Sequence, residues 1–117
     1  APSFSDLGIQ VGSLRYMAPE QFLKGPVSPR TDIYTLGTTL YRTLCGQFPF
    51  QGPNIEGGKL RKDPRPLREH APKLSEELCR EVMRTLERNP ARRFASMAEF
   101  ASALRAVPEW GDWEAPA

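Results

Sequence analysis

The sequence predicts a mainly α-helical fold in which four to five helices are joined by long loops. Three segments carry the apolar spacing or the capping residues expected of helices, namely residues 30–45, 75–87 and 96–104. With 117 residues, the chain is long enough for one small domain. Its 39% hydrophobic and 26% charged residues are typical of a folded protein rather than a disordered one.

The strongest predicted helix runs from about Arg30 to Cys45. Its apolar positions follow the spacing of one helix face and are Ile33, Leu36, Gly37, Leu40, Tyr41 and Leu44. From Ile33 to Cys45 the only charged residue is Arg42. A helix that is apolar around most of its circumference is usually buried inside a larger body. Gly46 follows as a natural C-terminal stop.

The other predicted helices are shorter. Ser75 begins one that extends to about Glu87, and another covers residues 96–104, where a serine and a glutamate three residues later form a capping-box pattern. Two brief helices are expected at residues 19–23, where a proline occupies the first turn, and near residues 55–61.

The charge distribution disfavours nucleic acid and membranes as partners. The formal net charge is only +2, and the basic residues are scattered apart from Lys59 to Arg68, which we expect to form a solvated loop. No stretch approaches the roughly 18 apolar residues of a membrane span, and no signal peptide is visible. We therefore expect no membrane contact by this chain and a cytoplasmic location.

Cysteine and histidine residues give no pattern typical of metal binding. The two cysteines, Cys45 and Cys79, both fall in apolar helical patterns and are expected to be buried free thiols. The single histidine, His70, is expected at the surface.

Five blocks of sequence, taken together, resemble one known family. Residues 12–20 (GSLRYMAPE) resemble the end of a protein kinase activation segment with its Ala-Pro-Glu signature. Four further blocks follow in the family's order, at residues 32–37, 46–50, 89–94 and 96–104. Over about residues 4 to 106 the chain is similar to serine/threonine protein kinases of the bacterial, eukaryotic-like type.

The resemblance implies the C-terminal part of a kinase large lobe. Residues 1–18 would then be a partial activation segment and substrate-holding loop. Residues 19–106 would form the helical C-lobe, and residues 107–117 a tail or linker.

The resemblance also assigns a substrate-holding loop, formed by Gly12, Ser13, Leu14, Arg15 and Tyr16. The Ser13 hydroxyl occupies the position from which serine/threonine kinases contact the catalytic loop, and Tyr16 stands where tyrosine kinases usually carry tryptophan. Both residues imply a serine or threonine acceptor. Without the resemblance, they are a polar loop serine and a packed tyrosine.

Three residues are implied as scaffold. Glu20 resembles the buried family glutamate that pairs with a distant arginine, for which Arg93 is the matching partner and Arg92 the alternative. Asp32 resembles the aspartate that accepts backbone N–H bonds from the catalytic loop. On sequence alone, Asp32 is also an ordinary N-terminal helix residue favoured by the helix dipole.

Asp6 is a candidate magnesium ligand. Residues 4–9 (FSDLGI) resemble the Asp-Phe-Gly block, whose aspartate binds the magnesium ions that bridge the nucleotide phosphates. The loop that follows is shorter than in the family, so an ordinary turn aspartate is the alternative. ATP and magnesium are implied for the complete parent protein, and neither is expected to bind tightly to this chain.

Most catalytic parts of a kinase are missing from the sequence. It has no Gly-rich loop, no strand lysine and no His-Arg-Asp catalytic loop, and Lys24 and Lys59 occur in the wrong contexts to replace them. The parent would transfer the γ-phosphoryl group of ATP to Ser or Thr of a protein substrate, while the isolated chain would be inactive without an N-terminal lobe and catalytic loop. A non-catalytic, pseudokinase-like interaction module is the alternative. A plain DNA-binding helical domain would need a basic recognition helix, which the sequence does not offer.

Overall fold

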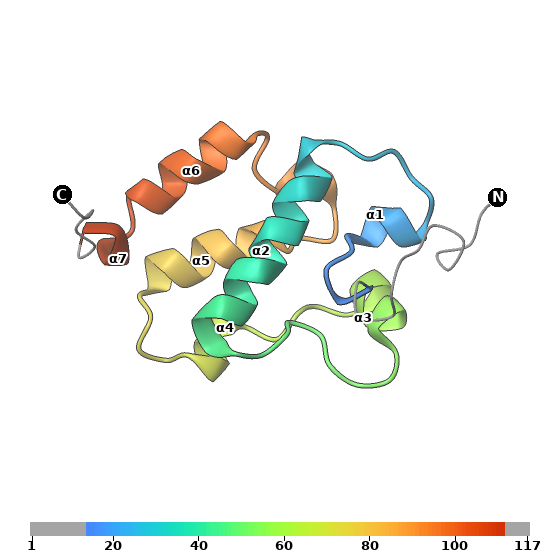
Figure 1. Ribbon diagram of the computed structural model, residues 1–117, viewed down its shortest axis with the longest axis horizontal. Coiled ribbons are helices and arrows are strands. Elements are labelled where there is room, and N and C mark those ends of the chain that lie inside the picture. The colour runs from blue at the N-terminus through green and yellow to red at the C-terminus, as the bar shows by residue number, and fades with distance from the viewer. Residues whose placement is uncertain (1–13, 112–117) are drawn as a thin grey trace.

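The computed structural model describes residues 14–111, and all regular structure within them is helical. This confirms the mainly α fold class. Figure 1 shows the longest helix, α2, crossing the middle of the molecule with the other helices around it. In chain order the elements are α1 (Pro19–Phe22), α2 (Pro29–Cys45), α3 (Ile55–Arg61), α4 (Leu67–His70), α5 (Glu76–Thr85), the 3-10 helix η2 (Pro90–Arg92), α6 (Met97–Arg105) and α7 (Pro108–Gly111).

Helix α2 has well-defined ends because both carry capping residues. The Ser28 side chain accepts a hydrogen bond from the backbone N–H of Arg30 at 3.2 Å, and the Thr31 hydroxyl accepts one from the backbone N–H of Ser28 at 3.2 Å. At the other end Gly46 adopts a left-handed conformation with φ of 77°, and its N–H donates to the Arg42 carbonyl at 2.7 Å. A residue without Cβ adopts this conformation without strain, which explains the stop at glycine.

One face of α2 is buried and the opposite face is exposed. The buried side carries Ile33, Tyr34, Gly37, Thr38 and Tyr41, together with Thr31 in the first turn. It packs against α4, α5, η2 and α6. The other side exposes threonines and charged residues, namely Asp32, Thr39, Arg42 and Thr43. The burial that the apolar composition predicted is therefore confined to one side within the described residues.

The apolar core has two parts. The larger joins α2, α4 and α5 to the turn before α7, around Tyr34, Tyr41, Leu67, Leu78, Val82, Leu86 and Val107. The smaller surrounds Ile33, where the rings of Phe94 and Phe100 lie 5.0 Å apart and join η2 to α6. Both parts use α2 as their common wall, so the position of this helix sets the positions of the others.

Three sequence expectations differ from the structure. Residues 59–68 were expected to be solvated, but Lys59 and Leu67 are almost fully buried. Residues 108–111 form the short helix α7, because Glu109 accepts hydrogen bonds from the N–H and hydroxyl of Ser75, at 2.7 and 2.6 Å. His70 is half-buried: its ring lies edge-on to Tyr41, and its Nε2 atom is enclosed without a hydrogen-bond partner among the described residues.

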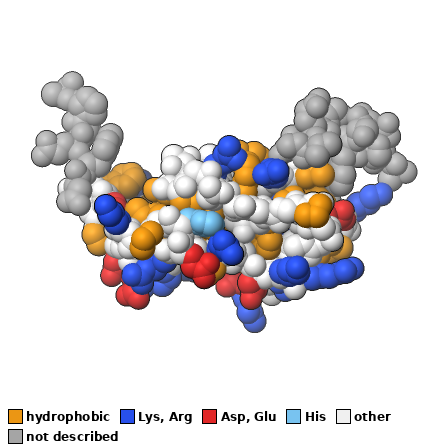
Figure 2. Space-filling model, turned by 90° about the horizontal axis from the view of Figure 1, so that it is seen from below, with side chains coloured by type: hydrophobic (Ala, Val, Ile, Leu, Met, Phe, Trp, Pro, Cys, Tyr) orange, Lys and Arg blue, Asp and Glu red, His pale blue; other side chains and the backbone are white. Residues whose placement is uncertain are grey.

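The expectation of two buried free thiols holds for one cysteine, and the expectation of scattered surface charges agrees with the face shown in Figure 2. Cys79 is buried and free, whereas Cys45 is free but only half-buried at the end of α2. On the face shown in Figure 2, basic and acidic side chains are interspersed rather than gathered by sign.

Gly37 marks the closest approach of α2 to α5. A Cβ added at this position would lie 2.5 Å from the Cβ of Thr85, a distance that real packing does not allow. Gly37→Ala should therefore destabilise the fold by about 1–3 kcal/mol through overpacking, although alanine is the better helix former. Urea unfolding measures this change, with Thr39→Ala on the exposed face of α2 as control. An unfolding free energy that rises in Gly37→Ala would contradict the packing described above.

Candidate functional site

The predicted substrate-holding loop leads directly into α1. Gly12, Ser13 and the candidate magnesium ligand Asp6 lie outside the described residues. Of the remaining loop residues, Arg15 is exposed, while Leu14 and Tyr16 are half-buried. The next residues, Met17 and Ala18, are buried, so the chain passes from the surface into the core within a few residues.

The side chain of Lys59, on α3, binds the backbone of this loop. Its Nζ atom donates hydrogen bonds to the carbonyl oxygens of Leu14, Arg15 and Met17, at 2.8, 2.8 and 2.7 Å. The residue lies on α3, more than forty positions along the chain, and is only 2% exposed. A single buried ammonium therefore fixes three backbone groups of the loop.

The Lys59 ammonium is enclosed, and no carboxylate among the described residues neutralises it. Burial lowers its pKa from the ordinary value of 10.5 to about 7. The three carbonyl contacts favour the charged form, because a neutral amine has only two N–H groups to donate. No Asp or Glu oxygen of residues 14–111 forms an ion pair with this nitrogen.

The carbonyl that Lys59 does not reach is bound by α2. The hydroxyl of Thr35 donates to the Tyr16 carbonyl at 3.0 Å. All four consecutive carbonyls from Leu14 to Met17 therefore accept a hydrogen bond from a side chain of α2 or α3. The Tyr16 ring also packs edge-on against Phe48, with ring centres 5.4 Å apart. These contacts hold the loop in one backbone conformation.

The structure places Glu20 against Arg93. The two guanidinium nitrogens Nη1 and Nη2 donate to the two carboxylate oxygens at 2.7 and 2.9 Å, in the bidentate geometry that gives the strongest ion pairs. The Arg93 side chain is 0% exposed and that of Glu20 is 11% exposed. The Thr31 hydroxyl adds a bond to the same carboxylate at 2.8 Å. The pair joins α1 to the segment after η2.

The pKa of Glu20 is set by opposing effects. Burial raises it, but hydrogen bonds from Arg93, the Glu20 backbone and Thr31, together with the Arg93 charge, lower it by more, so the pKa falls below its ordinary value of 4.5. The carboxylate is therefore ionised in the folded protein at neutral pH.

The other predicted scaffold residues lie apart from this pair. Arg92, the alternative partner of Glu20, is exposed at the end of η2. Asp32 is also exposed, in the first turn of α2, and within residues 14–111 no hydrogen bond to its carboxylate is found. Its first-turn position suits the helix dipole, and a role toward a catalytic loop remains a prediction.

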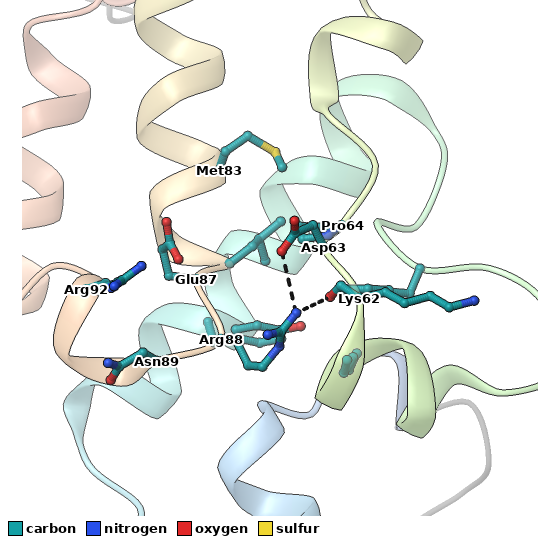
Figure 3. A pocket seen from close by; sticks show the side chains of 12 residues that line it. Lys62, Asp63, Pro64, Met83, Glu87, Arg88, Asn89 and Arg92 are labelled. Carbon is teal, nitrogen blue, oxygen red and sulfur yellow. Dashed lines mark hydrogen bonds and ion pairs between the residues drawn. The ribbon is translucent and has the colours of Figure 1, made fainter.

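A pocket of about 560 Å³ opens between α3 and the end of α5. Arg88 lies in its wall and donates to the Lys62 carbonyl at 2.8 Å and to Asp63 at 3.5 Å, while the Lys62 side chain extends away from Arg88 (Figure 3). Among the described residues predicted for substrate or scaffold, Arg92, the alternative partner of Glu20, lines this pocket, and so does Lys59. Glu20, Arg93 and the loop residues 14–16 are not part of its lining, so we take the loop and its supports as the candidate site.

Across positions 14–111, no group of three or more His, Cys, Asp or Glu side chains is placed to hold a metal ion. In the same part of the chain, no helix has both the length and the apolar character needed to span a bilayer.

Comparison with known proteins decides the family. Residues 3–104 match the protein kinase domain. This chain belongs to the protein kinase family. It is 39% identical over 112 residues to the serine/threonine-protein kinase pkn2 of Myxococcus xanthus, an alignment covering 92% of this chain and 14% of that kinase.

Other relatives are also bacterial serine/threonine-protein kinases. PknA of Mycobacterium tuberculosis is 36% identical over 92% of this chain and 25% of its own length. PknB of the same species is 34% identical over 91% of this chain and 17% of its own length. The predicted family and the helical C-lobe fold are thus confirmed, and the chain spans a quarter or less of the length of these relatives.

Lys59 is the site residue that the sequence interpretation missed. The sequence placed it in a stretch rich in charge and proline, which is typical of a solvated loop. The one available signal was the predicted short helix at residues 55–61, which could have given this lysine a buried face. Because a helix of seven residues has little periodicity, that face could not be identified.

Breaking the Glu20–Arg93 pair should be costly. Glu20→Ala or Arg93→Ala leaves a buried charge without its partner, which costs about 3–5 kcal/mol of unfolding free energy. Glu69→Ala, which removes an exposed pair with Arg65, should cost no more than about 1 kcal/mol. Thermal melting compares the three variants. Melting temperatures that are unchanged in both Glu20→Ala and Arg93→Ala would reject the pairing as a source of stability.

Stability should also depend on pH through Glu20. Because its folded pKa lies below the unfolded value of about 4.5, the unfolded chain binds more protons between the two values, and unfolding becomes easier as pH falls. The stabilisation is complete above about pH 5 and is lost as pH falls through the folded pKa. Urea titrations from neutral to acid pH should show the advantage of the wild type over Glu20→Gln shrinking below that range. A constant difference down to acid pH would contradict the lowered pKa.

Removing the Lys59 ammonium should loosen the loop. Lys59→Met keeps much of the apolar stem but removes the donor from the Arg15 and Met17 carbonyls and leaves the Leu14 carbonyl with only the Met17 N–H at 3.4 Å, at a cost of about 1–3 kcal/mol. Trypsin should then cut the native protein after Arg15 faster than in the wild type. Lys62→Met, on an exposed neighbour, controls for charge, and Gly37→Ala controls for lost stability away from the loop. Equal rates of cleavage in Lys59→Met and Gly37→Ala would show that Lys59 does not hold the loop.

Proposed function

We propose that this chain supplies the substrate-holding loop and helical scaffold of a protein serine/threonine kinase domain. In the whole protein, that domain transfers the γ-phosphoryl group of ATP to a Ser or Thr hydroxyl of a protein substrate. One observation carries the proposal: side chains of α2 and α3 bind all four carbonyls from Leu14 to Met17. Phosphoryl transfer depends mainly on positioning and on charge stabilisation, so a fixed acceptor platform is what such a domain needs.

The roles of individual residues follow from the family. Gly12 to Tyr16 hold the acceptor segment, and the Ser13 hydroxyl contacts the catalytic loop. Asp32 orients that loop through its backbone N–H groups, while Glu20 and Arg93 act as scaffold. Asp6 is a ligand for the magnesium ions that accompany ATP. The exposed carboxylate of Asp32 supports its part of this assignment, because it is available to a further segment.

The remaining kinase parts must come from outside this sequence. An N-terminal lobe and a His-Arg-Asp catalytic loop are its required partners, and the 117-residue chain alone is inactive. Because ATP is the phosphoryl donor, the proposed location is the cytoplasm.

A chimera tests the proposal. Residues 3–104 replace the matching segment of the Myxococcus xanthus kinase pkn2, which supplies the rest of a kinase domain. The chimera should phosphorylate a peptide containing Ser or Thr and leave the matched Tyr peptide unmodified, while the 117-residue chain with ATP shows no turnover. A chimera that melts cooperatively and binds ATP but phosphorylates nothing would favour the non-catalytic interaction module. Turnover by the isolated chain would contradict its proposed inactivity.

A further inference from the structure

Two arginines contact one aromatic ring beside the substrate-holding loop. Phe48, which follows α2, is only 9% exposed. The guanidinium carbon of Arg15 lies 4.8 Å from the centre of its ring, and that of Arg42 lies 4.0 Å from the same centre. Arg15 belongs to the loop and Arg42 to the last turn of α2, so Phe48 brings together residues that are distant in sequence.

Neither of these arginines is neutralised within the described residues. Six other arginines there form an ion pair with an Asp or Glu, namely Arg65, Arg68, Arg80, Arg84, Arg88 and Arg93. Arg15 and Arg42 form none, and both are exposed. Their shared ring centre keeps the two charges no more than about 9 Å apart, close to the Debye length of about 8 Å at physiological ionic strength. The two cations therefore repel each other until an anion binds between them or beside them.

The two guanidinium groups are also held in place. The Arg15 carbonyl is bound by Lys59, which fixes the backbone from which this side chain extends. Arg42 is anchored in a regular helix, and stacking on Phe48 restricts both side chains further. A guanidinium presents a flat fork of donors that matches a carboxylate, so a restricted arginine pair is preorganised for acidic groups.

We propose that Arg15 and Arg42 form an arginine fork that selects acceptor peptides carrying Glu or Asp near the phosphorylated residue. The fork binds the substrate carboxylate, and stacking on Phe48 restricts both guanidinium groups. This inference rests on the proposed function of residues 12–16 as the substrate-holding loop. The substrate class is thus an acidic Ser/Thr segment of a protein.

Peptide binding to the 117-residue chain tests the fork directly. Two fluorescent peptides of equal length carry one Ser, flanked by Glu in the first and by Gln in the second. Fluorescence anisotropy at low salt should show the Glu peptide binding about tenfold more tightly. The double variant Arg15→Gln/Arg42→Gln should lose this preference, whereas Arg105→Gln on α6, an exposed arginine far from the loop, should keep it.

Reversing the two charges distinguishes lost binding from lost stability, in case Arg15→Gln/Arg42→Gln is less stable than the wild type. In Arg15→Glu/Arg42→Glu the preference should switch to a peptide flanked by Lys, provided that circular dichroism shows a folded chain. If Arg105→Gln lost the preference for the Glu peptide to the same extent, the preference would come from diffuse charge attraction, and the proposed fork would be overturned. The absence of peptide binding by the folded wild-type chain would also overturn it.

The kinase chimera separates this inference from the proposed function. An active chimera should have a lower KM for the Glu peptide than for the Gln peptide, and the double variant should lose this difference between the two peptides, whatever change in KM the two peptides share. An active chimera without acid preference would overturn the fork and leave the proposed function standing. The chimera could be inactive while the 117-residue chain still binds the Glu peptide through Arg15 and Arg42. That result would support an acid-binding surface but would contradict its role in selecting kinase substrates.

Discussion

The fold depends on one buried guanidinium. Arg93 has five N–H donors, and the structure gives each donor group a partner: two bonds reach the Glu20 carboxylate, and three reach backbone carbonyls of Arg30, Glu87 and Arg88. These partners belong to α1, the start of α2 and the segment that follows α5. A charge so deeply buried is tolerated only because every donor is satisfied and one partner is an anion. The helices it joins must therefore keep their relative positions.

That constraint extends to the substrate-holding loop through two anchors. Glu20 fixes the chain just after the loop, because its carboxylate is held by Arg93 and Thr31. Lys59, on α3, fixes the loop itself. A backbone held at both points loses little further conformational freedom when a peptide binds, so less of the binding free energy is spent on ordering the loop. In a kinase domain, this rigidity is the scaffold's contribution to the positioning on which phosphoryl transfer relies.

The two buried cations are compensated in different ways. Arg93 has a carboxylate partner, whereas Lys59 has three carbonyl oxygens and the rings of Phe22 and Tyr34 around its nitrogen, but no carboxylate among residues 14–111. This difference explains why burial lowers the pKa of Lys59 so far. Lys59, Arg15 and Arg42 leave the surroundings of the loop with positive charges that no carboxylate among residues 14–111 pairs with. The electrostatic character of this face therefore differs from that of the α4–α5 side, where Arg65, Arg68 and Arg80 each pair with an acid.

The sequence by itself determined the kinds of element and the family. Apolar spacing and capping residues predicted α2, α5 and α6 nearly to their ends, because these signals act between residues that are close in the chain. Motif order indicated the kinase C-lobe for a similar reason, since each block is a short local pattern.

Only the tertiary structure decided which distant groups meet. Arg92 and Arg93 are neighbours with the same chemistry, yet only Arg93 turns inward to Glu20, because the chain direction after η2 sets which side chain faces the core. In the sequence Lys59 looks like any loop lysine, but the packing of α3 against the loop lets it donate hydrogen bonds to three carbonyl oxygens more than forty residues earlier in the chain. Burial and partners of charged groups are properties of packing between elements, and no local pattern in the chain records them.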